Sequence, residues 1–211
     1  MLGTGLAGAG DNAQAELVLR RAQQRYPRDV WINYMLGAVL AKLSRGDEAI
    51  RFYTAARAIR PETAHALAHA LENRGDRDEA IAVFRDLNRL RPGNADHLNC
   101  LGMALKRKGL SREADETLEA AVAAAREEVR LKPDSASSLF PLAAALRNKG
   151  QRDEAIASYK KAIAINPKFA EAHFRLGELL QAVSFDPKNN GQRDEAIAHF
   201  KKAIAIDPTF T

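Results

Sequence analysis

The chain has 211 residues and a formal net charge of +5; 46% of its residues are hydrophobic and 28% are charged. This balance predicts a folded protein and excludes an intrinsically disordered chain. No apolar run approaches the roughly 18 residues that cross a bilayer, and the first ten residues lack the basic start and apolar core of a secretory signal. The single cysteine, Cys100, excludes an intrachain disulfide and favours a reducing, cytoplasmic compartment.

Helix-forming residues dominate the apolar part of the sequence, in which alanine prevails and aromatic residues contribute only 6% of the chain. Prolines follow at a regular interval: Pro27 and Pro61 are 34 residues apart, and so are Pro133 and Pro167. This spacing indicates an internal repeat. Before successive prolines the apolar residues recur with helical spacing. They predict helices at residues 49–59, 80–90, 155–165 and 196–206.

Each of these four helices opens on the same block, Asp-Glu-Ala-Ile, and acidic residues suit the first turn of a helix. The helix before it in each unit carries a small residue after a leucine, which lets two helices approach closely. These pairs are Leu36-Gly37, Leu67-Ala68, Leu101-Gly102, Leu142-Ala143 and Leu176-Gly177. Between the two helices lies a glycine, whose backbone tolerates the left-handed conformation that ends a helix. The turn glycines are Gly46, Gly75, Gly109, Gly150 and Gly191.

Residues of the same kind recur at fixed offsets in three of the units. They are Leu36, Gly37, Leu40, Ala49, Tyr53, Ala56 and Pro61 in one unit; Leu101, Gly102, Leu105, Ala114, Leu118 and Ala121 in a second; and Leu176, Gly177, Leu180, Ala196, Phe200, Ala203 and Pro208 in a third. Two helices, a glycine turn and a proline every 34 residues resemble the tetratricopeptide repeat (TPR) family.

The resemblance covers essentially the whole chain. It implies an all-α fold, an α-solenoid of stacked helix-turn-helix repeats that forms a right-handed superhelix. We expect one array over residues 1–211. Its parts are a partial repeat at 1–27, five repeats at 28–61, 62–92, 93–133, 134–167 and 168–208, and a tail at 209–211.

Three irregularities interrupt the expected array. Pro61 and Pro92 are only 31 residues apart, which predicts a shortened turn or first helix after Pro61 and a local change in curvature. Seven additional residues extend a helix at 113–131 by two turns, so it should protrude by about 10 Å. Another seven, with Pro187 among them, predict a loop at 184–191.

Several motifs suggest chemistry, but each is better explained by structure. The G-x-G-x-x-G run at residues 3–8 lacks the strand and βαβ unit that dinucleotide binding requires. His65 and His69 could share a helix face, yet even with His97 they fall short of the four ligands of a structural zinc site. Cys100 is expected to be a small buried thiol without a local base. We therefore expect no metal, no cofactor and no catalytic residue.

Other charged and aromatic residues also have simple structural roles. The Asp-Glu pairs are interpreted as helix starts, and the basic run 106–108 as a solvated helix end. One aromatic position recurs in four units and is expected in the core rather than as a platform for stacked bases. These residues are Tyr53, Phe84, Tyr159 and Phe200. Nucleic-acid binding is not expected.

In TPR proteins the first helix of each repeat usually lines a concave binding surface, so the resemblance implies which residues form a peptide-binding groove here. They combine aromatic, amide and charged side chains, and the net charge favours an acidic ligand. The groove residues are Tyr34, Lys42, His65, His69, Asn99, Met103, Lys106, Phe140, Arg147, Phe174, Glu178 and Gln181.

The leading functional hypothesis is a non-enzymatic scaffold that binds a protein or peptide in this groove. The alternative, also implied by resemblance, is a regulatory TPR array of a larger bacterial enzyme such as a serine/threonine kinase or a glycosyltransferase. A further hypothesis is self-association through uncapped ends, near Ile197, Ile204 and Phe210.

Overall fold

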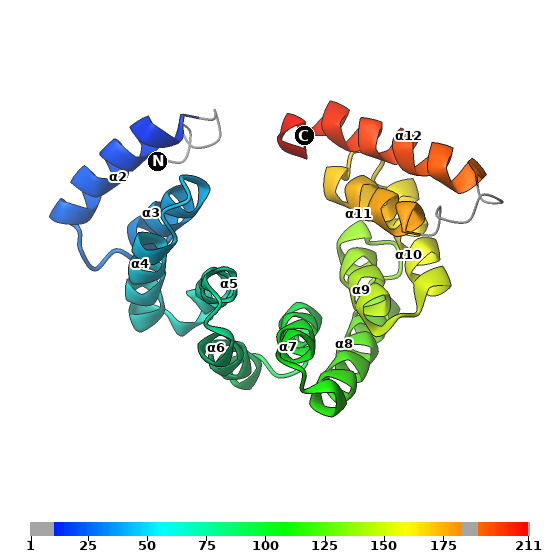
Figure 1. Ribbon diagram of the computed structural model, residues 1–211, viewed down its shortest axis with the longest axis horizontal. Helices are drawn as coiled ribbons and strands as arrows, with labels where there is room; N and C mark the ends of the chain where they lie inside the picture. Colours follow the sequence, from blue (N-terminus) through cyan, green and yellow to red (C-terminus); the bar gives the residue numbers. More distant parts are fainter. Residues whose placement is uncertain (1–10, 183–189, 211) are drawn as a thin grey trace. The chain divides into compact units, whose positions relative to one another are not determined.

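The computed structural model describes residues 11–182 and 190–210. This part of the chain consists of α-helices, two short 3-10 helices and their connections, without a strand (Figure 1). The elements are α2 (Asn12–Arg25), α3 (Val30–Lys42), α4 (Gly46–Ile59), η1 (Pro61–Ala64), α5 (His65–Arg74), α6 (Arg77–Leu90), α7 (Ala95–Lys108), α8 (Ser111–Leu131), α9 (Ala136–Lys149), α10 (Arg152–Ile165), α11 (Ala170–Gln181), α12 (Asn190–Ile206) and η3 (Pro208–Phe210).

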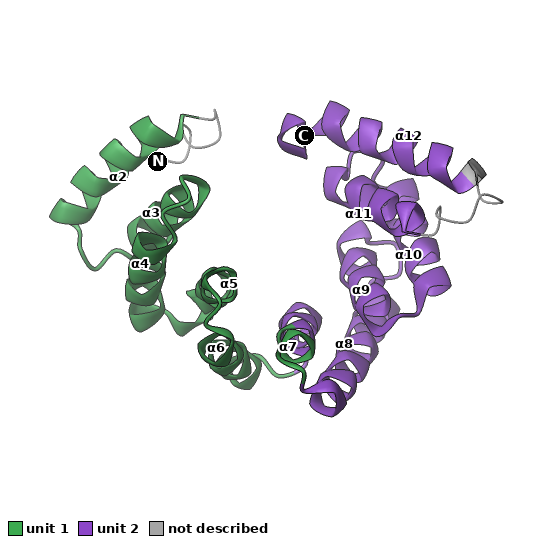
Figure 2. Ribbon diagram, in the orientation of Figure 1, with its two compact units in different colours: residues 1–92, 104–109 green, residues 93–103, 110–211 purple. Residues whose placement is uncertain are grey.

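The helices gather into two compact units (Figure 2). Unit 1 comprises Met1–Pro92 and Ala104–Gly109, and unit 2 comprises Gly93–Met103 and Leu110–Thr211. Within unit 1, α3 packs on α4 and α5 packs on α6; within unit 2, α9 packs on α10 and α11 packs on α12. The prediction of an all-α fold of stacked helix pairs is therefore confirmed, while the repeat boundaries, the single array and its superhelical hand stay predictions.

Glycine sets the distance between the two helices of a pair. A Cβ atom at Gly37 would lie 2.8 Å from the Tyr53 ring, and one at Gly177 would lie 2.8 Å from Phe200. At Gly102 the obstacle is Leu118, at 2.7 Å. Real Cβ contacts are not this short, so the structure confirms that a small residue in the first helix permits close approach.

The recurring aromatic position faces the core, as predicted. Tyr53, Phe84 and Tyr159 are buried, and Phe200 is half-buried at the edge of the unit 2 core. Around these rings, alanine and leucine from both helices of each pair fill the interior. Apolar burial of this kind supplies most of the free energy that favours folding.

The first turn corrects one expectation. Gly75, Gly109 and Gly150 adopt positive φ between their helices, but Gly46 does not. Ser44 takes the left-handed conformation instead, with φ 59°, and the following amide of Arg45 donates to the Leu40 carbonyl at 2.9 Å. Helix α3 thus ends at Lys42, four residues before the glycine, and Gly46 becomes the first residue of α4.

The irregular spacings have clear structural counterparts. The 3-10 helix η1 takes the place of the first turn after Pro61 and leaves α5 with 10 residues, as the short spacing predicts. Helix α8 has 21 residues, which confirms the extended helix. The predicted loop at 184–191 lies largely outside the described residues, as does the motif at 3–8. The last two residues of the predicted loop, 190 and 191, were wrongly assigned to it, because α12 already begins at Asn190.

Helix starts follow the acidic blocks in three of four cases. Asp47 and Glu48 lie in the first turn of α4, and equivalent pairs open α6 and α10. Helix α12 is the exception, since its early start at Asn190 leaves Asp194 beyond the first turn.

Candidate functional site

In unit 1, helix α3 holds Tyr34 in an aromatic cluster. The centroid of its ring lies 6.2 Å from that of Trp31 and 5.6 Å from that of Tyr53. Burial, with a smaller contribution from Tyr34, raises the pKa of Tyr53 to about 12. Tyr34 itself is half-buried, so one part of its ring is fixed by packing and the rest is accessible. Lys42, at the end of the same helix, is exposed.

The two histidines of α5 form the second cluster of unit 1. The rings of His65 and His69 meet edge to face at 4.7 Å, and both pack on Phe84. Nδ1 of His69 lies 3.1 Å from a carboxylate oxygen of Glu72, and Arg107 donates to the other oxygen at 2.8 Å. Burial acts to raise the pKa of Glu72, but these two hydrogen bonds outweigh it and lower the pKa. The lowered pKa keeps Glu72 charged where it contacts His69.

In unit 2, the predicted rings of α9 and α11 are each covered by a second phenylalanine. Phe140 lies 4.9 Å from Phe169 and 5.6 Å from Tyr159, measured between centroids. Phe174 lies 5.1 Å from Phe210. The two stacks are alike, with interplanar angles of 32° and 38°. Phe140 and Phe174 are half-buried, so they are ordered and partly accessible.

Beside these rings, α9 and α11 share a charged cluster. One oxygen of Glu178 accepts from Arg147 at 3.4 Å and from Arg175 at 3.1 Å. The guanidinium group of Arg175 also lies 5.8 Å from the centroid of Phe174. One helix pair earlier, Asn148 donates to Asn99 at 2.9 Å. The structure therefore brings together Asn99, the α9 residues and the α11 residues within unit 2.

The hydroxyl of Tyr159 lies behind this cluster. The side chain is fully buried, and its hydroxyl makes no hydrogen bond with the described residues. Burial raises its pKa to about 12, although Arg147 and Arg175 act in the opposite direction. A buried polar group without a partner costs free energy, so this hydroxyl is a weak point of the unit 2 core.

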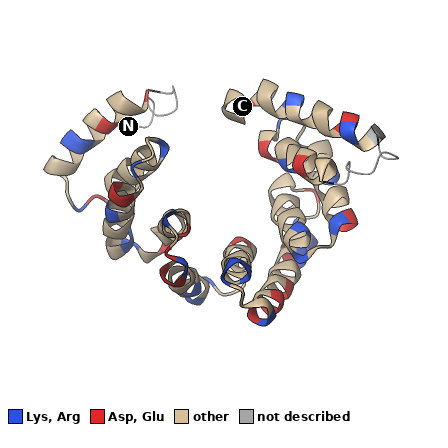
Figure 3. Cartoon of the chain, in the orientation of Figure 1, with Lys and Arg blue, Asp and Glu red and all other residues tan. Residues whose placement is uncertain are grey.

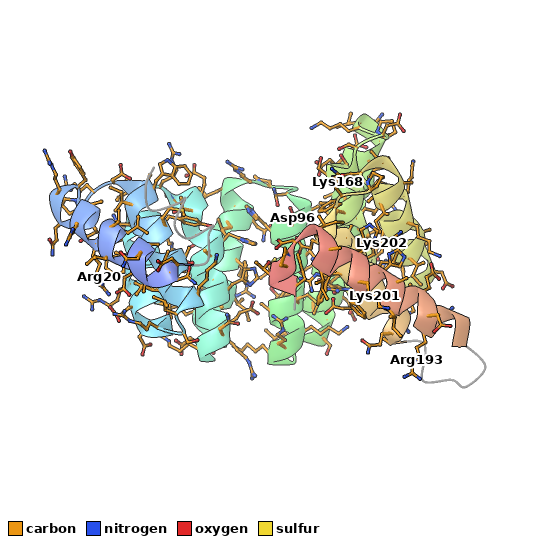
Figure 4. The ribbon with its side chains drawn as sticks, turned by 90° about the horizontal axis from the view of Figure 1, so that it is seen from above. Arg20, Asp96, Lys168, Arg193, Lys201 and Lys202 are labelled. Atoms are coloured by element: carbon orange, nitrogen blue, oxygen red, sulfur yellow. The ribbon has the colours of Figure 1, made fainter. Side chains whose placement is uncertain are left out.

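Acidic groups gather where α7 begins. Figure 4 shows Asp96 in the first turn of this helix. Burial of its carboxyl group raises its pKa, and the carboxylate of Glu128 adds to this, as does that of Glu171 at the start of α11. This end of unit 2 is therefore unfavourable for further negative charge.

The other predicted residues differ in their exposure. Met103 is half-buried, whereas Lys106 and Gln181 are exposed. Cys100 is half-buried rather than buried, which corrects the expectation of a buried thiol.

The sequence did not predict four residues that contact the predicted groove residues of unit 2. They are Asn148, Phe169, Arg175 and Phe210. The two phenylalanines had a signal, since each follows a proline by two residues in the nearly identical segments 150–169 and 191–210. Asn148 and Arg175 had none beyond standing next to a predicted residue.

The units differ in charge. Unit 1 contains 17 lysine and arginine residues against 11 aspartate and glutamate residues, whereas unit 2 contains 15 against 16. Figure 3 shows both signs along most helices, α8 among them. The basic excess of the chain therefore belongs to unit 1.

Comparison with known families identifies the fold. Four protein-family models match the chain. The TPR repeat model matches residues 143–184, and the Tetratricopeptide Repeats-Sensor model matches residues 45–137. Two Tetratricopeptide repeat models match residues 1–63 and 170–210. The chain is a tetratricopeptide repeat protein. A search of curated proteins found no match to this TPR chain.

Solved structures of TPR proteins resemble it. A thermophilic TPR protein of Thermus thermophilus is 24% identical with a TM-score of 0.62, covering 85% of this chain and 96% of that one. A chain of the APC/C hetero-tetramer Cut9-Hcn1 is 18% identical with a TM-score of 0.62; 98% of this chain matches 39% of that one. A TPR protein of Parabacteroides merdae is 17% identical with a TM-score of 0.54, covering 96% and 76%. At these identities the likeness shows the fold.

No helix in the described ranges, 11–182 and 190–210, combines the length and apolarity needed to cross a membrane.

Proposed function

We propose that this TPR protein is a non-enzymatic scaffold that binds a partner polypeptide on helices α9 and α11 of unit 2, each the first helix of its pair. The surface consists of Phe140, Arg147, Phe174, Arg175 and Glu178, here called the α9–α11 surface. The observation that carries the proposal is the pair of half-buried phenylalanine stacks beside two guanidinium groups that share one carboxylate.

The rings supply apolar contact area at a low entropic cost. Phe140 and Phe174 are already held by Phe169 and Phe210, so a partner does not have to order them. Aromatic and arginine side chains are also the residues that most often dominate the binding energy of interfaces.

The arginines favour an acidic group on the partner. Their hydrogen bonds to Glu178, at 3.1 and 3.4 Å, are longer than the 2.7–2.9 Å typical of strong charge-assisted bonds. Arg175 also donates to Glu171 at 3.5 Å and Arg147 to Asn148 at 3.4 Å, yet each guanidinium has five N–H donors, more than these weak bonds use. A partner carboxylate beside an apolar side chain would therefore complement the α9–α11 surface.

The remaining predicted groove residues complete the proposal. In unit 2 they are Asn99, Met103 and Gln181. In unit 1, Tyr34, Lys42, His65, His69 and Lys106 are proposed to contact the same or another polypeptide. The exposed lysines and half-buried rings of unit 1 repeat, on a more basic unit, the combination seen in the α9–α11 surface.

The test is affinity capture from native lysate with mass spectrometry of the bound proteins. The double variant Arg147→Ala/Arg175→Ala removes both guanidinium groups, and the amount of captured partner is expected to fall roughly tenfold or more. The matched control is Arg126→Ala on α8, since Arg126 also pairs with a glutamate, Glu154, at 2.8 Å. Equal capture by the double variant and the control would contradict the proposal.

A further inference from the structure

Unit 1 contains an apolar pocket that no predicted groove residue lines. It lies between α4, η1 and α6 and has a volume of about 560 Å³. Ala58, Pro61 and Leu90 contribute to its wall, and Ala64 and Leu87 to its buried base. A volume of this size is typical of sites that take ligand groups.

The pocket follows from the shortened spacing after Pro61. The 3-10 helix η1 packs against both α4 and α6, in the place where a regular first turn would continue α5. It leaves Leu90, the last residue of α6, with 48% of its surface exposed at the edge of the concavity. An exposed leucine beside an apolar concavity marks a surface suited to a partner.

Basic groups stand at the mouth of the pocket. Arg57 of α4 donates to one oxygen of Asp86 at 2.9 Å, and Arg89 of α6 donates to the other at 2.8 Å. Asp86 thus holds both guanidinium groups in place while neutralising only one charge. Their other N–H donors make no hydrogen bond with the described residues. The excess of basic side chains in unit 1 adds to the positive field.

We propose that this α4–α6 pocket is a second docking site, which takes the apolar side chains of an acidic amphipathic helix from a partner protein. The apolar base accepts one face of the helix, and carboxylates at its border pair with Arg57 and Arg89. The site does not depend on the α9–α11 surface, because no residue is common to both.

The chain provides a matched control for this site. Arg89-Leu90 ends α6 at the pocket, and Arg130-Leu131 ends α8 in unit 2, where Leu131 is 65% exposed and lies outside the α4–α6 pocket. The two dipeptides have the same composition and the same position in their helices. Replacing either pair with glutamates therefore makes the same change in charge and hydropathy.

The probe is a fluorescein-labelled amphipathic peptide of leucine, alanine and glutamate, with leucine at positions i and i+4 along one face. Fluorescence anisotropy with the full chain should give saturable binding. The variant Arg89→Glu/Leu90→Glu should bind at least tenfold more weakly, as should Ala58→Glu, which places a carboxylate in the pocket wall. The variant Arg130→Glu/Leu131→Glu should bind like the parent protein, and a peptide with lysine in place of glutamate should bind at least tenfold more weakly.

Three results would overturn the proposal: no saturable binding of the acidic peptide, equal loss in the α6 and α8 variants, or equal binding of the lysine peptide. Loss of the probe in Arg147→Ala/Arg175→Ala, with full binding in the α6 variant, would instead place the peptide on the α9–α11 surface. Failure of either site is thus distinguishable from failure of the other.

Discussion

Units 1 and 2 share a packing rule but differ at their surfaces. In both, a glycine of the first helix faces a large side chain of the second, Gly37 against Tyr53 and Gly177 against Phe200. The surfaces diverge: unit 1 has a basic excess, a shortened joint and an apolar pocket, whereas unit 2 has paired phenylalanine stacks and near-neutral charge. The comparison indicates that the buried small-to-large contacts maintain the helix pair, while the other positions are free to specialise.

The largest effect should follow from breaking the shared packing rule. Gly37→Val and Gly177→Val each force a side chain into a ring 2.8 Å from the new Cβ atom. Overpacking of this kind should cost about 3 kcal/mol in each unit. The midpoint of urea unfolding, followed by circular dichroism, measures the loss.

Gly46→Ala is the control for these variants, since a Cβ atom at Gly46 meets nothing within 4 Å. Its effect should be within about 1 kcal/mol, and in the stabilising direction. If the valine variants were as stable as the control, the packing rule would be wrong; if only one were destabilised, it would hold in one unit alone.

A pH effect should appear in unit 2, where α11 and α12 are joined by two histidines. Nε2 of His173 lies 3.1 Å from the Pro167 carbonyl, which can only accept, so this nitrogen carries the hydrogen. Nδ1 of His173 then accepts from Nδ1 of His199 at 2.8 Å. His173 is 1% exposed. The pair is a neutral hydrogen bond that a second proton would break.

Burial lowers the pKa of both histidines; the proximity of Lys202 adds to this, and for His199 so does that of Lys160, while Glu195 opposes it. The unfolded chain therefore binds more protons than the folded one as the pH falls below the ordinary value of 6.5, and stability falls with it. The loss should be on the order of 2 kcal/mol, the cost of an unpaired buried donor.

His173→Asn should reduce this pH dependence, because only His199 then keeps a pKa lowered by burial. Asn33 in α3 donates to the Pro27 carbonyl at 2.9 Å, six residues away, as His173 does to Pro167, so an asparagine can keep the backbone contact. Chemical unfolding at pH 7.5 and pH 5.5 should give a larger difference in stability for the parent chain than for the variant. A parent chain equally stable at both values would refute the role of the pair.

A smaller effect concerns the buried hydroxyl of unit 2. Tyr159→Phe removes a polar atom without a partner in the described residues, so the variant should be as stable as the parent or more stable, by about 1 kcal/mol. The change in stability is compared with that of Tyr53→Phe, which removes the hydroxyl group at the equivalent position of unit 1. Thermal unfolding decides: a Tyr159→Phe variant that melts well below the parent would mean that the hydroxyl has a structural partner.

The smallest effect should come from the ion pairs of unit 1. Glu16 accepts from Arg20 at 2.6 Å and from Arg45 at 2.7 Å, and Arg20, which Figure 4 places on α2, also contacts Glu48. The hydrogen bond from Arg20 is the main cause that lowers the pKa of Glu16, so its contribution is present above the ordinary value of 4.5 and lost as the pH falls through the lowered value. Glu16→Gln should cost less than about 1 kcal/mol, because solvent screens such pairs. A loss that persists in 1 M salt would contradict this.

The helix pairs were readable in the sequence because they depend on local, repeated signals. Pro61, Gly75 and the acidic pair at 47–48 mark helix ends wherever they occur, and the spacing after Pro61 correctly predicts a short α5. The prediction failed at the first turn, where a serine and not the expected glycine takes the left-handed conformation. Ser44 adopts the left-handed conformation expected of Gly46, since a turn can also end a helix with a serine when the next amides are satisfied.

The candidate surfaces were less predictable, because they depend on which helices meet. The repeat offset predicts Phe140 and Phe174 as groove residues, but the rings that cover them come from later segments, at Phe169 and Phe210. The α4–α6 pocket had no sequence signal at all. It arises from the way η1 fills the shortened joint, which a residue count cannot describe.

The central claim is that a partner binds the α9–α11 surface, and isothermal titration calorimetry with the captured partner tests it most directly. Arg147→Ala/Arg175→Ala should raise the dissociation constant at least tenfold (roughly 1.4 kcal/mol or more), and Arg126→Ala should leave it within about twofold. Equal dissociation constants for the parent chain and both variants would contradict the account.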